Sequence, residues 1–412
     1  MATEPQELQV PISPVLLELI TPENLADPYP LYRRYRETDP MHFADIGVWT
    51  LTRYADILAV LRDDRFSVDP RNATELERFF PATDNTPRPF EQMAGLLLLF
   101  TDPPDHTRMR NLVNKAFTRR VVEELRPHVQ EIVDELLDNV AGRGEMDVIG
   151  DFAFQLPALV ICELMGVPVE DRDKFHGMSA DIAPILDPIT PPEALEKAMY
   201  TAGLFVMYFV QLLEERRKDP RDDLLSALLA AEEHEQKLSQ EEVIALCVLI
   251  FIAGHETTQN LIGNGLLALL RNPEQLGLLR DDPSLTRDAN EELLRYDSPV
   301  QLTGRSALTD IEIGGRTIRK GQEVVVLLGA GNHDPVMFSD PDRLDITRER
   351  SSVLSFGGGV HFCLGAPLAR LEGQIAFNSL IKRFPNIELA TDTPEFRPTL
   401  TLRGLRSLPV RF

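Results

Sequence analysis

The chain has 412 residues, of which 43% are hydrophobic, so it can bury a large core. Its formal net charge of −23 argues against nucleic-acid binding, which requires a basic surface. Three cysteines in a chain of this length do not make a disulfide framework and favour a reducing compartment.

The sequence contains no obvious domain boundary. Length alone would suggest two or three domains, but no Ser/Gly-rich linker or block of charge divides the chain. We therefore expect one domain over 1–412, with a tail at about 1–20 that could be flexible. The N-terminus has neither a basic n-region nor an apolar h-region, so we expect no signal peptide. The longest apolar run, Val243–Ala253, is too short to span a bilayer, which predicts a cytoplasmic protein without a membrane anchor.

The first half of the chain is predicted to be mostly helical. Short elements come first, with a strand at 48–52 and a helix at 55–61. Several prolines make 71–104 irregular. Helical periodicity then dominates from 106 to about 231, with a break at the proline-rich stretch 184–192.

A long helix and a β region follow. Ser239 and Glu242 have the spacing of a capping box, which opens a predicted helix of about 33 residues that ends near Pro273. After Pro299 the pattern changes to that of hairpin strands, which are predicted at 311–313, 316–318 and 323–327. The predicted fold class is therefore mainly α with a smaller β region.

The most informative cysteine is Cys363. A glycine-rich loop precedes it, and a helix is predicted directly after it from the apolar residues Leu368, Leu371, Ile375 and Leu380. A thiol at a helix N-terminus lies where free N–H groups and the macrodipole favour the thiolate. The glycines leave room for a flat, bulky group, which suggests an axial thiolate on haem iron. The commonest role of a lone cysteine is nevertheless that of a buried core residue, the role we predict for Cys162 and Cys247.

The run from Phe356 to Gly365 fits the pattern F-G-x-G-x-H-x-C-x-G, which has six fixed positions. It resembles the haem-binding signature of the cytochrome P450 family, the haem-thiolate monooxygenases. Three further motifs follow the family order, so the resemblance spans about Asp27 to the C-terminus. It implies the cytochrome P450 fold, with a long central helix over haem b, and the pattern of a soluble bacterial member. Cys363 would bind the iron, and Phe356, His361 and Gly365 would contribute to the haem site.

The predicted long helix carries a polar stretch, Ala253-Gly-His-Glu-Thr-Thr258, in the middle of an apolar sequence. A solvated helix face is the ordinary explanation for such residues, but buried polar groups need partners. By resemblance this stretch crosses the distal face of the haem. Thr257 would hold a water network near bound oxygen, Glu256 would feed protons, and Ala253 and Gly254 would leave room for oxygen and substrate. We expect His255 to point elsewhere and not to bind iron.

Glu292 and Arg295 have the i,i+3 spacing of a pair on one helix face, which is usually a surface ion pair of small energetic value. By resemblance they match the E-x-x-R pair that stabilises the proximal side of the family's fold. Arg343 matches the third member of that network. We predict a structural role for all three.

Basic residues are candidates for the haem carboxylates. His106 and Arg110 lie one helical turn apart, and taken alone they are better explained by a solvated basic helix start. By resemblance they bind the haem propionates, together with Arg305 and His361. Four such groups for two carboxylates are chemically reasonable.

These features predict a monooxygenase that inserts one oxygen atom from O2 into a hydrophobic small molecule. No flavin or nicotinamide module is visible, so a separate ferredoxin or flavodoxin with its reductase would supply the electrons. Such partners are usually acidic, and a local basic patch would bind them, with these candidates: Arg108, Lys115, Arg119 and Arg120. A peroxide-driven peroxygenase is an alternative that the presence of Glu256 and Thr257 disfavours. A haem-based sensor without turnover is a second alternative.

The family resemblance also places the substrate pocket. It would be lined by four mainly apolar stretches: Phe90–Leu98, Met178–Leu186, Val300–Thr303 and Leu400–Leu402. A fatty acid, a terpenoid or a polyketide is a plausible substrate, and its identity does not follow from the sequence.

Overall fold

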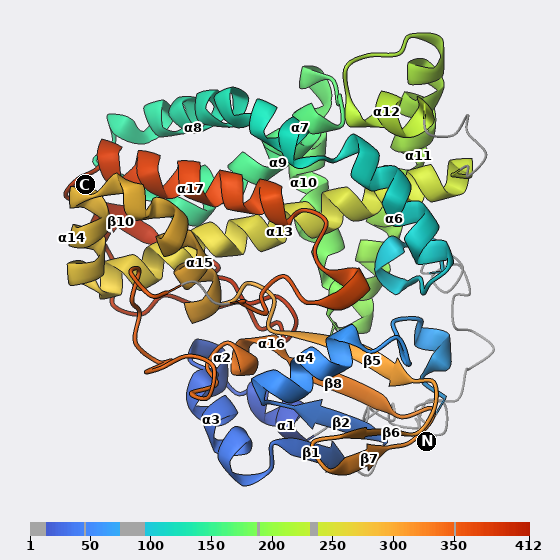
Figure 1. The fold of residues 1–412 in the computed structure, drawn as a ribbon. Coiled ribbons are helices and arrows are strands. Elements are labelled where there is room, and N and C mark those ends of the chain that lie inside the picture. Colours follow the sequence, from blue (N-terminus) through green and yellow to red (C-terminus); the bar gives the residue numbers. More distant parts are fainter. Residues whose placement is uncertain (1–13, 45–46, 75–94, 188–189, 231–237, 350–351) are drawn as a thin grey trace, which may run out of the picture.

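The computed structural model describes residues 14–44, 47–74, 95–187, 190–230, 238–349 and 352–412. In Figure 1 most helices form one part of the molecule, and a mixed sheet with its covering helices forms the other. The predicted fold class, mainly α with a smaller β region, is confirmed. None of the helices in these ranges is long and apolar enough to cross a membrane.

The helical part contains eleven of the labelled helices, most of them in the region predicted to be helical. Their bounds are α6 (Asp105–Ala116), α7 (Arg119–Glu124), α8 (Arg126–Ala141), α9 (Gln155–Leu164), α10 (Arg172–Ile182), α11 (Pro192–Lys218), α12 (Leu224–Ala230), α13 (Gln240–Arg271), α14 (Pro273–Asp281), α15 (Thr286–Tyr296) and α17 (Ala366–Arg383). The predicted break is confirmed, because α10 ends in a 3-10 turn at Ala183–Leu186. The strand β4 (Glu145–Asp147) and a π-helical turn at Val148–Ala153 interrupt the helices and were not predicted.

The central helix α13 begins and ends where the sequence predicts. The Ser239 hydroxyl accepts from the amide of Glu242 at 3.2 Å, and the Glu242 carboxylate accepts from the amide of Ser239 at 2.8 Å. This capping box starts a helix of 32 residues that is buried over most of its length. Figure 1 shows α13 running beside α17, and the two helices pack against each other. A helix that is apolar on nearly all sides is stable only inside the protein.

The sheet part is built around five strands in the order β1-β2-β8-β5-β3. Their bounds are β1 (Met41–Ala44), β2 (Val48–Leu51), β3 (Phe66–Ser67), β5 (Leu302–Ala307) and β8 (Glu323–Leu327). The helices α1 (Pro14–Leu19), α2 (Pro22–Ala26), α3 (Tyr29–Thr38), α4 (Tyr54–Arg62) and α16 (Leu328–Gly331) belong to the same part of the chain fold. The predicted strand at 48–52 and helix at 55–61 are thereby confirmed as β2 and α4.

One prediction about the strands is wrong in part. The hairpin is confirmed as β6 (Ile311–Ile313) paired antiparallel with β7 (Arg316–Ile318). Residues 323–327 do not extend that hairpin, because β8 pairs in parallel with β2 and antiparallel with β5. Four of the five residues of β8 are buried, as is typical of an inner strand that is paired along both edges and covered on both faces. A third sheet joins β4, β10 (Pro409–Arg411) and β9 (Glu388–Leu389).

A buried ion network on α15 supports the segment before Cys363. The guanidinium of Arg295 donates two bonds of 2.8 Å to the Glu292 carboxylate, and both side chains are buried. Arg295 also donates to the carbonyls of Asn332 and Pro341 at 2.9 and 2.7 Å. The predicted structural pair is therefore confirmed as a buried one.

The prediction that Arg343 is the third member of this network is wrong. Its side chain is 63% exposed and pairs with Asp345 at 3.3 Å. Arg348 takes the place instead, because its Nε donates to both oxygens of Glu292 at 3.2 and 3.1 Å. Arg343 contributes only its backbone carbonyl, which accepts from Arg295 and Arg348 at 3.3 and 3.0 Å.

Candidate functional site

The loop before Cys363 has a backbone that glycine alone accommodates easily. Gly357 and Gly359 have φ values of 69° and 65°, in the left-handed region. A Cβ on Gly359 would lie 2.1 Å from the carbonyl oxygen of Leu61, so a side chain there would also collide with α4. The loop therefore packs closely on the sheet part and delivers Cys363 to the start of α17.

Helix α17 begins at Ala366, and the Cys363 thiol lies at its N-terminus as the sequence predicts. The backbone N–H groups of Gly365 and Ala366 point to the thiol and act to lower its pKa, as does Arg110, whereas burial raises it. Cys363 has solvent-accessible surface, and protein atoms nevertheless lie around its thiol on most sides. The accessible surface of the thiol therefore faces a space within the molecule rather than the outer surface. The other two cysteines, Cys162 and Cys247, are buried core residues, and that prediction is confirmed.

The predicted apolar residues of α17, namely Leu368, Leu371, Ile375 and Leu380, are all buried. In the loop, Phe356 is buried and the guanidinium of Arg370 lies 4.4 Å from its ring centre. Val360 and Phe362 remain 43% and 40% exposed next to Cys363. The loop thus presents apolar surface around an accessible thiol, as a flat apolar ligand would require.

The middle of α13 has one accessible face. Ala253 is exposed and Thr257 is half-buried, whereas the neighbouring residues His255 and Glu256 are buried. The Thr257 hydroxyl donates to the carbonyl of Ala253, one turn earlier in the helix, at 2.8 Å. The accessible face of this helix therefore consists of small side chains and one hydroxyl group.

Two neighbouring residues of α13 face other helices. The Nε2 atom of His255 lies 2.8 Å from the carbonyl of Phe154, so this ring points away from Ala253 and Thr257, as predicted. A Cβ on Gly254 would lie 2.8 Å from the side chain of Ile161. Gly254 therefore permits close packing of α13 against α9, whereas the sequence predicts for it a role in leaving room for oxygen.

Glu256 is buried beside a residue that sequence reasoning missed. Its Oε1 atom lies 2.6 Å from Nη1 of Arg397, and its Oε2 atom has no hydrogen-bond partner among the described residues. Burial raises the pKa of Glu256, Arg397 acts to lower it and Asp187 to raise it. A polar repeat on α13 could have indicated the interaction, because Glu256, Asn260 and Asn264 are spaced four residues apart on one face.

The predicted basic residues gather around His361. The rings of His106 and His361 are 4.1 Å apart, and Arg110 donates to the carbonyl of Phe362. His106 is buried, and neither of its ring nitrogens has a hydrogen-bond partner in the described part of the chain. Burial lowers the pKa of His106 to about 4 and that of His361 to about 3, and the neighbouring cations Arg110 and, for His361, Arg305 add to the effect.

Arg305 completes this group from β5. It is buried, and it donates to the Gly304 carbonyl at 2.6 Å and to the Thr303 hydroxyl at 3.3 Å. Burial lowers its pKa to about 10, and Asp102 acts in the opposite direction. Buried basic groups with so few acceptors fit two carboxylate groups of a ligand. The chemistry of the donor set, a thiol with this basic group near it, therefore fits haem.

Three of the four stretches predicted to line a substrate pocket lie side by side. Val300 pairs with Leu402, and the amide of Gln301 donates to the carbonyl of Thr401 at 2.9 Å. The carboxylate of Asp187, directly after 178–186, accepts from the amide of Leu400 at 2.7 Å. Most of 90–98 lies outside the described residues, so that part of the prediction stays untested.

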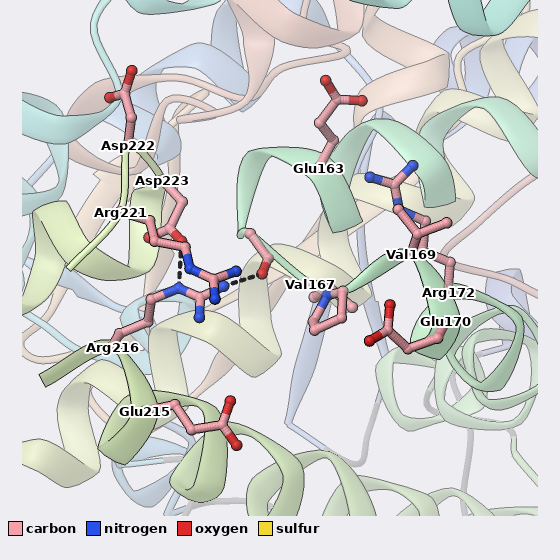
Figure 2. A pocket seen from close by; sticks show the side chains of 12 residues that line it. Glu163, Val167, Val169, Glu170, Arg172, Glu215, Arg216, Arg221, Asp222 and Asp223 are labelled. Carbon is pink, nitrogen blue, oxygen red and sulfur yellow. Dashed lines mark hydrogen bonds and ion pairs between the residues drawn. The ribbon is translucent and has the colours of Figure 1, made fainter. Parts of the chain in front are cut away.

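A separate pocket of about 540 Å³ lies between α9 and α11 (Figure 2). Its lining includes charged residues of both signs, and it holds none of the predicted site residues. Arg216 is buried there, where it donates to Asp223 at 2.6 Å and to the carbonyl of Gly166. The buried cation of this pocket, Arg216, is therefore already paired within the protein. The residues that line the pocket do not form a recognisable catalytic centre.

The site geometry agrees with comparisons to known proteins. The sequence model of the family "Cytochrome P450" matches residues 77–282 and 279–406. A vitamin D(3) 25-hydroxylase of Pseudonocardia autotrophica is 44% identical, over 93% of each chain. A 6-deoxyerythronolide B hydroxylase of Saccharopolyspora erythraea is 41% identical, over 93% of this chain and 96% of that protein.

Solved structures give the same result. A structure of P450BioI, in complex with an acyl carrier protein ligated with hexadec-9Z-enoic acid, has a TM-score of 0.88 and 41% identity. The match covers 95% of this chain and 99% of that chain. A full-length match of this kind, with the cysteine loop and the central helix in place, shows that the chain belongs to the cytochrome P450 family of haem-iron monooxygenases.

Proposed function

We propose that this enzyme inserts one oxygen atom from O2 into a hydrophobic small molecule, with haem b as its cofactor. The observation that carries the proposal is the accessible thiol of Cys363 inside the protein, at the N-terminus of α17. Haem iron, when bound, supplies the activation of O2 and the one-electron chemistry that side chains lack.

Cys363 would hold the iron as a thiolate. The N–H groups of Gly365 and Ala366 favour the negative charge on sulfur, and Arg110 adds a nearby cation. His106, Arg110, Arg305 and His361 would bind the two propionates, which would give the ring N–H of the buried His106 a partner that the described residues do not supply. The small residues Gly365 and Ala253 would leave space around the haem ring, and Phe356 would fill space beside it.

Glu256 and Thr257 would take part in proton transfer. The Thr257 hydroxyl gives its hydrogen to the Ala253 carbonyl, so its lone pairs can accept from a water on the accessible side of α13. The Oε2 atom of Glu256 has no partner among the residues that the structure describes, so a proton can be bound and released there. Burial raises the pKa of Glu256 toward neutral pH. A group whose pKa is near the working pH can both take up and give up a proton. This arrangement favours the O2 route over a peroxygenase.

The names of the relatives support a largely apolar substrate. Vitamin D(3), 6-deoxyerythronolide B and hexadec-9Z-enoic acid appear in the names of those proteins and of the solved complex. The stretches at 178–186, 300–303 and 400–402 are mainly apolar in this chain as well. We therefore propose a fatty acid, terpenoid or polyketide type of molecule as the substrate class.

The test combines binding and labelling. A panel of these three compound classes is screened by the haem spin-state shift, and each hit is incubated with isotopically labelled O2, a ferredoxin and its reductase. One labelled oxygen atom in the product is expected. Label derived only from added peroxide would indicate a peroxygenase, and a spin shift without any product would indicate a binding or sensor protein.

A ferredoxin or flavodoxin with its reductase would supply electrons at the basic patch. Arg119 and Arg120 are exposed on α7, whereas Arg108 pairs with Glu242 at 3.1 Å. The side chain of Lys115 lies outside the described residues. Arg119→Glu with Arg120→Glu is expected to lower the electron-transfer rate about tenfold at low salt, less at high salt. Arg411→Glu, an exposed arginine on β10, is the control, and equal losses in both variants would contradict this docking surface.

A further inference from the structure

The C-terminal segment 396–405 packs on one face of α13. Phe396 pairs with Leu405, and the amide of Arg397 donates to the Gly404 carbonyl at 2.8 Å, so the segment folds back on itself. The Asn264 side chain, from α13, donates to the carbonyl of Arg403 at 2.9 Å. The segment is therefore fixed against the helix that carries Glu256.

Gly404 makes this contact unusually close. A Cβ on Gly404 would lie 1.9 Å from the Oδ1 atom of Asn260, so a side chain there would push the segment and the helix apart. The same Oδ1 atom accepts a hydrogen bond of 2.6 Å from Nη2 of Arg397. The glycine thus allows the arginine to reach α13.

The guanidinium of Arg397 bridges two residues one turn apart on α13. Nη1 lies 2.6 Å from Oε1 of Glu256, and Nη2 donates to Asn260. The side chain of Glu256 is 6% exposed and that of Arg397 is 25% exposed, so the ion pair is poorly screened by water. A planar guanidinium held at both terminal nitrogens has little freedom to turn.

A second charged group, Asp187, comes from the turn after α10. Its Oδ2 atom accepts from the amides of Leu400 and Thr401 at 2.7 and 2.9 Å, which anchors the segment from the other side. In the described part of the chain, Arg397 and Asp187 are the two charged groups that act on the Glu256 carboxyl, with opposite effects. The position of Arg397 therefore decides the charge balance at Glu256.

We propose that Arg397 is a positioning residue for proton transfer: it fixes one oxygen of Glu256, stabilises the carboxylate, and leaves Oε2 as the atom that exchanges protons. In each cycle Oε2 would take a proton from a water connected to solvent and pass it to the next water, so the carboxylate is regenerated. No electron moves in this step. The inference rests on the proposed role of Glu256 as a proton donor.

The first test measures the ionisation of Glu256 without turnover. Difference infrared spectra of the ferric enzyme, taken against Glu256→Gln, follow the carboxyl band of Glu256 with pH. Removing the cation in Arg397→Gln is expected to raise the midpoint by about 1–3 pH units, because an opposite charge at this distance lowers a carboxyl pKa by that amount. An unchanged midpoint would overturn the proposal.

Turnover provides the second test. In Arg397→Gln the pH dependence of O2-dependent product formation should shift in the same direction as the infrared midpoint, and Arg397→Lys should restore part of the wild-type profile. Arg406→Gln removes an exposed cation from the same region of the chain and should change neither quantity. A profile in Arg397→Gln that matches wild type would also contradict the proposal.

Two further results separate the possible failures. If Glu256→Gln forms product at the wild-type rate and coupling, the proposed role of Glu256 is wrong, whatever Arg397 does. If Arg397→Gln does not fold with haem, the comparison is made with Arg397→Lys, whose compact ammonium cannot reach both Glu256 and Asn260 in the same way. Its midpoint must then lie above that of wild type, and an equal midpoint would overturn the inference.

Discussion

The hydroxyl of Thr257 lies on the accessible face of α13 and donates to its own helix. That bond uses the hydroxyl hydrogen and orients the lone pairs, so the group can hold a water without being a proton source itself. A carboxyl one residue earlier, on the buried side, can supply the proton. Thr257 is therefore expected to hold the water, and Glu256 is expected to provide the proton.

Thr257→Ala is expected to uncouple oxygen consumption from product formation. Alanine keeps the helix but removes the hydroxyl, so substrate binding and haem content should be normal while more of the consumed oxygen leaves as hydrogen peroxide. Product formed per electron donor consumed is measured with peroxide assayed in parallel. Thr257→Ser, which keeps a hydroxyl, is the control. Wild-type coupling in Thr257→Ala would show that this hydroxyl is not needed.

At the scale of single residues the sequence predicts local chemistry well. The thiol at the start of α17 and the orientation of His255 both follow from neighbours within one or two turns. Arg348 and Arg397 were missed, because their partners lie more than 50 residues away and depend on how loops return to a helix. Roles in haem and proton binding stay predictions for all these residues.

The network on α15 shows how a single element holds the segments before Cys363. Arg348→Ala should lower the free energy of unfolding by about 3–5 kcal/mol, because it leaves the buried Glu292 carboxylate without one of its two cations. Arg343→Ala should change it by less than about 0.5 kcal/mol, since that side chain is exposed. Chemical unfolding with haem content measured in parallel distinguishes the two. A larger loss in Arg343→Ala would reverse the assignment.

Helix α17 carries a buried carboxyl group, that of Glu372. Glu372 is buried, its Oε2 atom has no partner among the described residues, and burial raises its pKa to about 8. A carboxyl whose folded pKa lies above its unfolded value of 4.5 binds more protons when folded. Its contribution to stability is thus fully present below about pH 4.5 and is lost as the pH rises to about 8.

Glu372→Gln removes this dependence. The variant should gain stability relative to wild type by up to about 1.4 kcal/mol per pH unit between those two pH values, because glutamine stays neutral. Unfolding by urea at pH 5 and at pH 8, followed by circular dichroism, measures the difference. A gain of equal size at both pH values would contradict a neutral, buried Glu372 in the folded protein.

The bounds of α13 and the hairpin of β6 and β7 were predicted nearly to the residue, and the pairing of β8 was not. The capping box and the following proline bound α13 because both signals are local. The apolar sequence of β8 identifies a buried strand but not its neighbours, and its partner β2 lies more than 270 residues earlier in the chain. Register between such distant strands depends on the whole packed core.

The loop of Cys363 and helix α13 both belong to one fold. In Figure 1 the sheet part of this fold lies below the helical part. Composition and motif order were enough to predict the fold class, and a single domain over 1–412 stays a prediction. The net charge of −23 predicts that any acidic electron donor must find a local basic surface. Substrate identity depends on pocket shape, which no local pattern encodes.

The central claim is that Cys363 is the thiolate ligand of the haem iron. The most direct measurement is the absorption spectrum of the reduced enzyme with carbon monoxide. Wild type should show the strongly red-shifted Soret band of thiolate ligation, and Cys363→His should move it to the position of an imidazole-ligated haem and abolish oxygenation. A spectrum of Cys363→His that is the same as that of wild type would contradict ligation of the iron by Cys363.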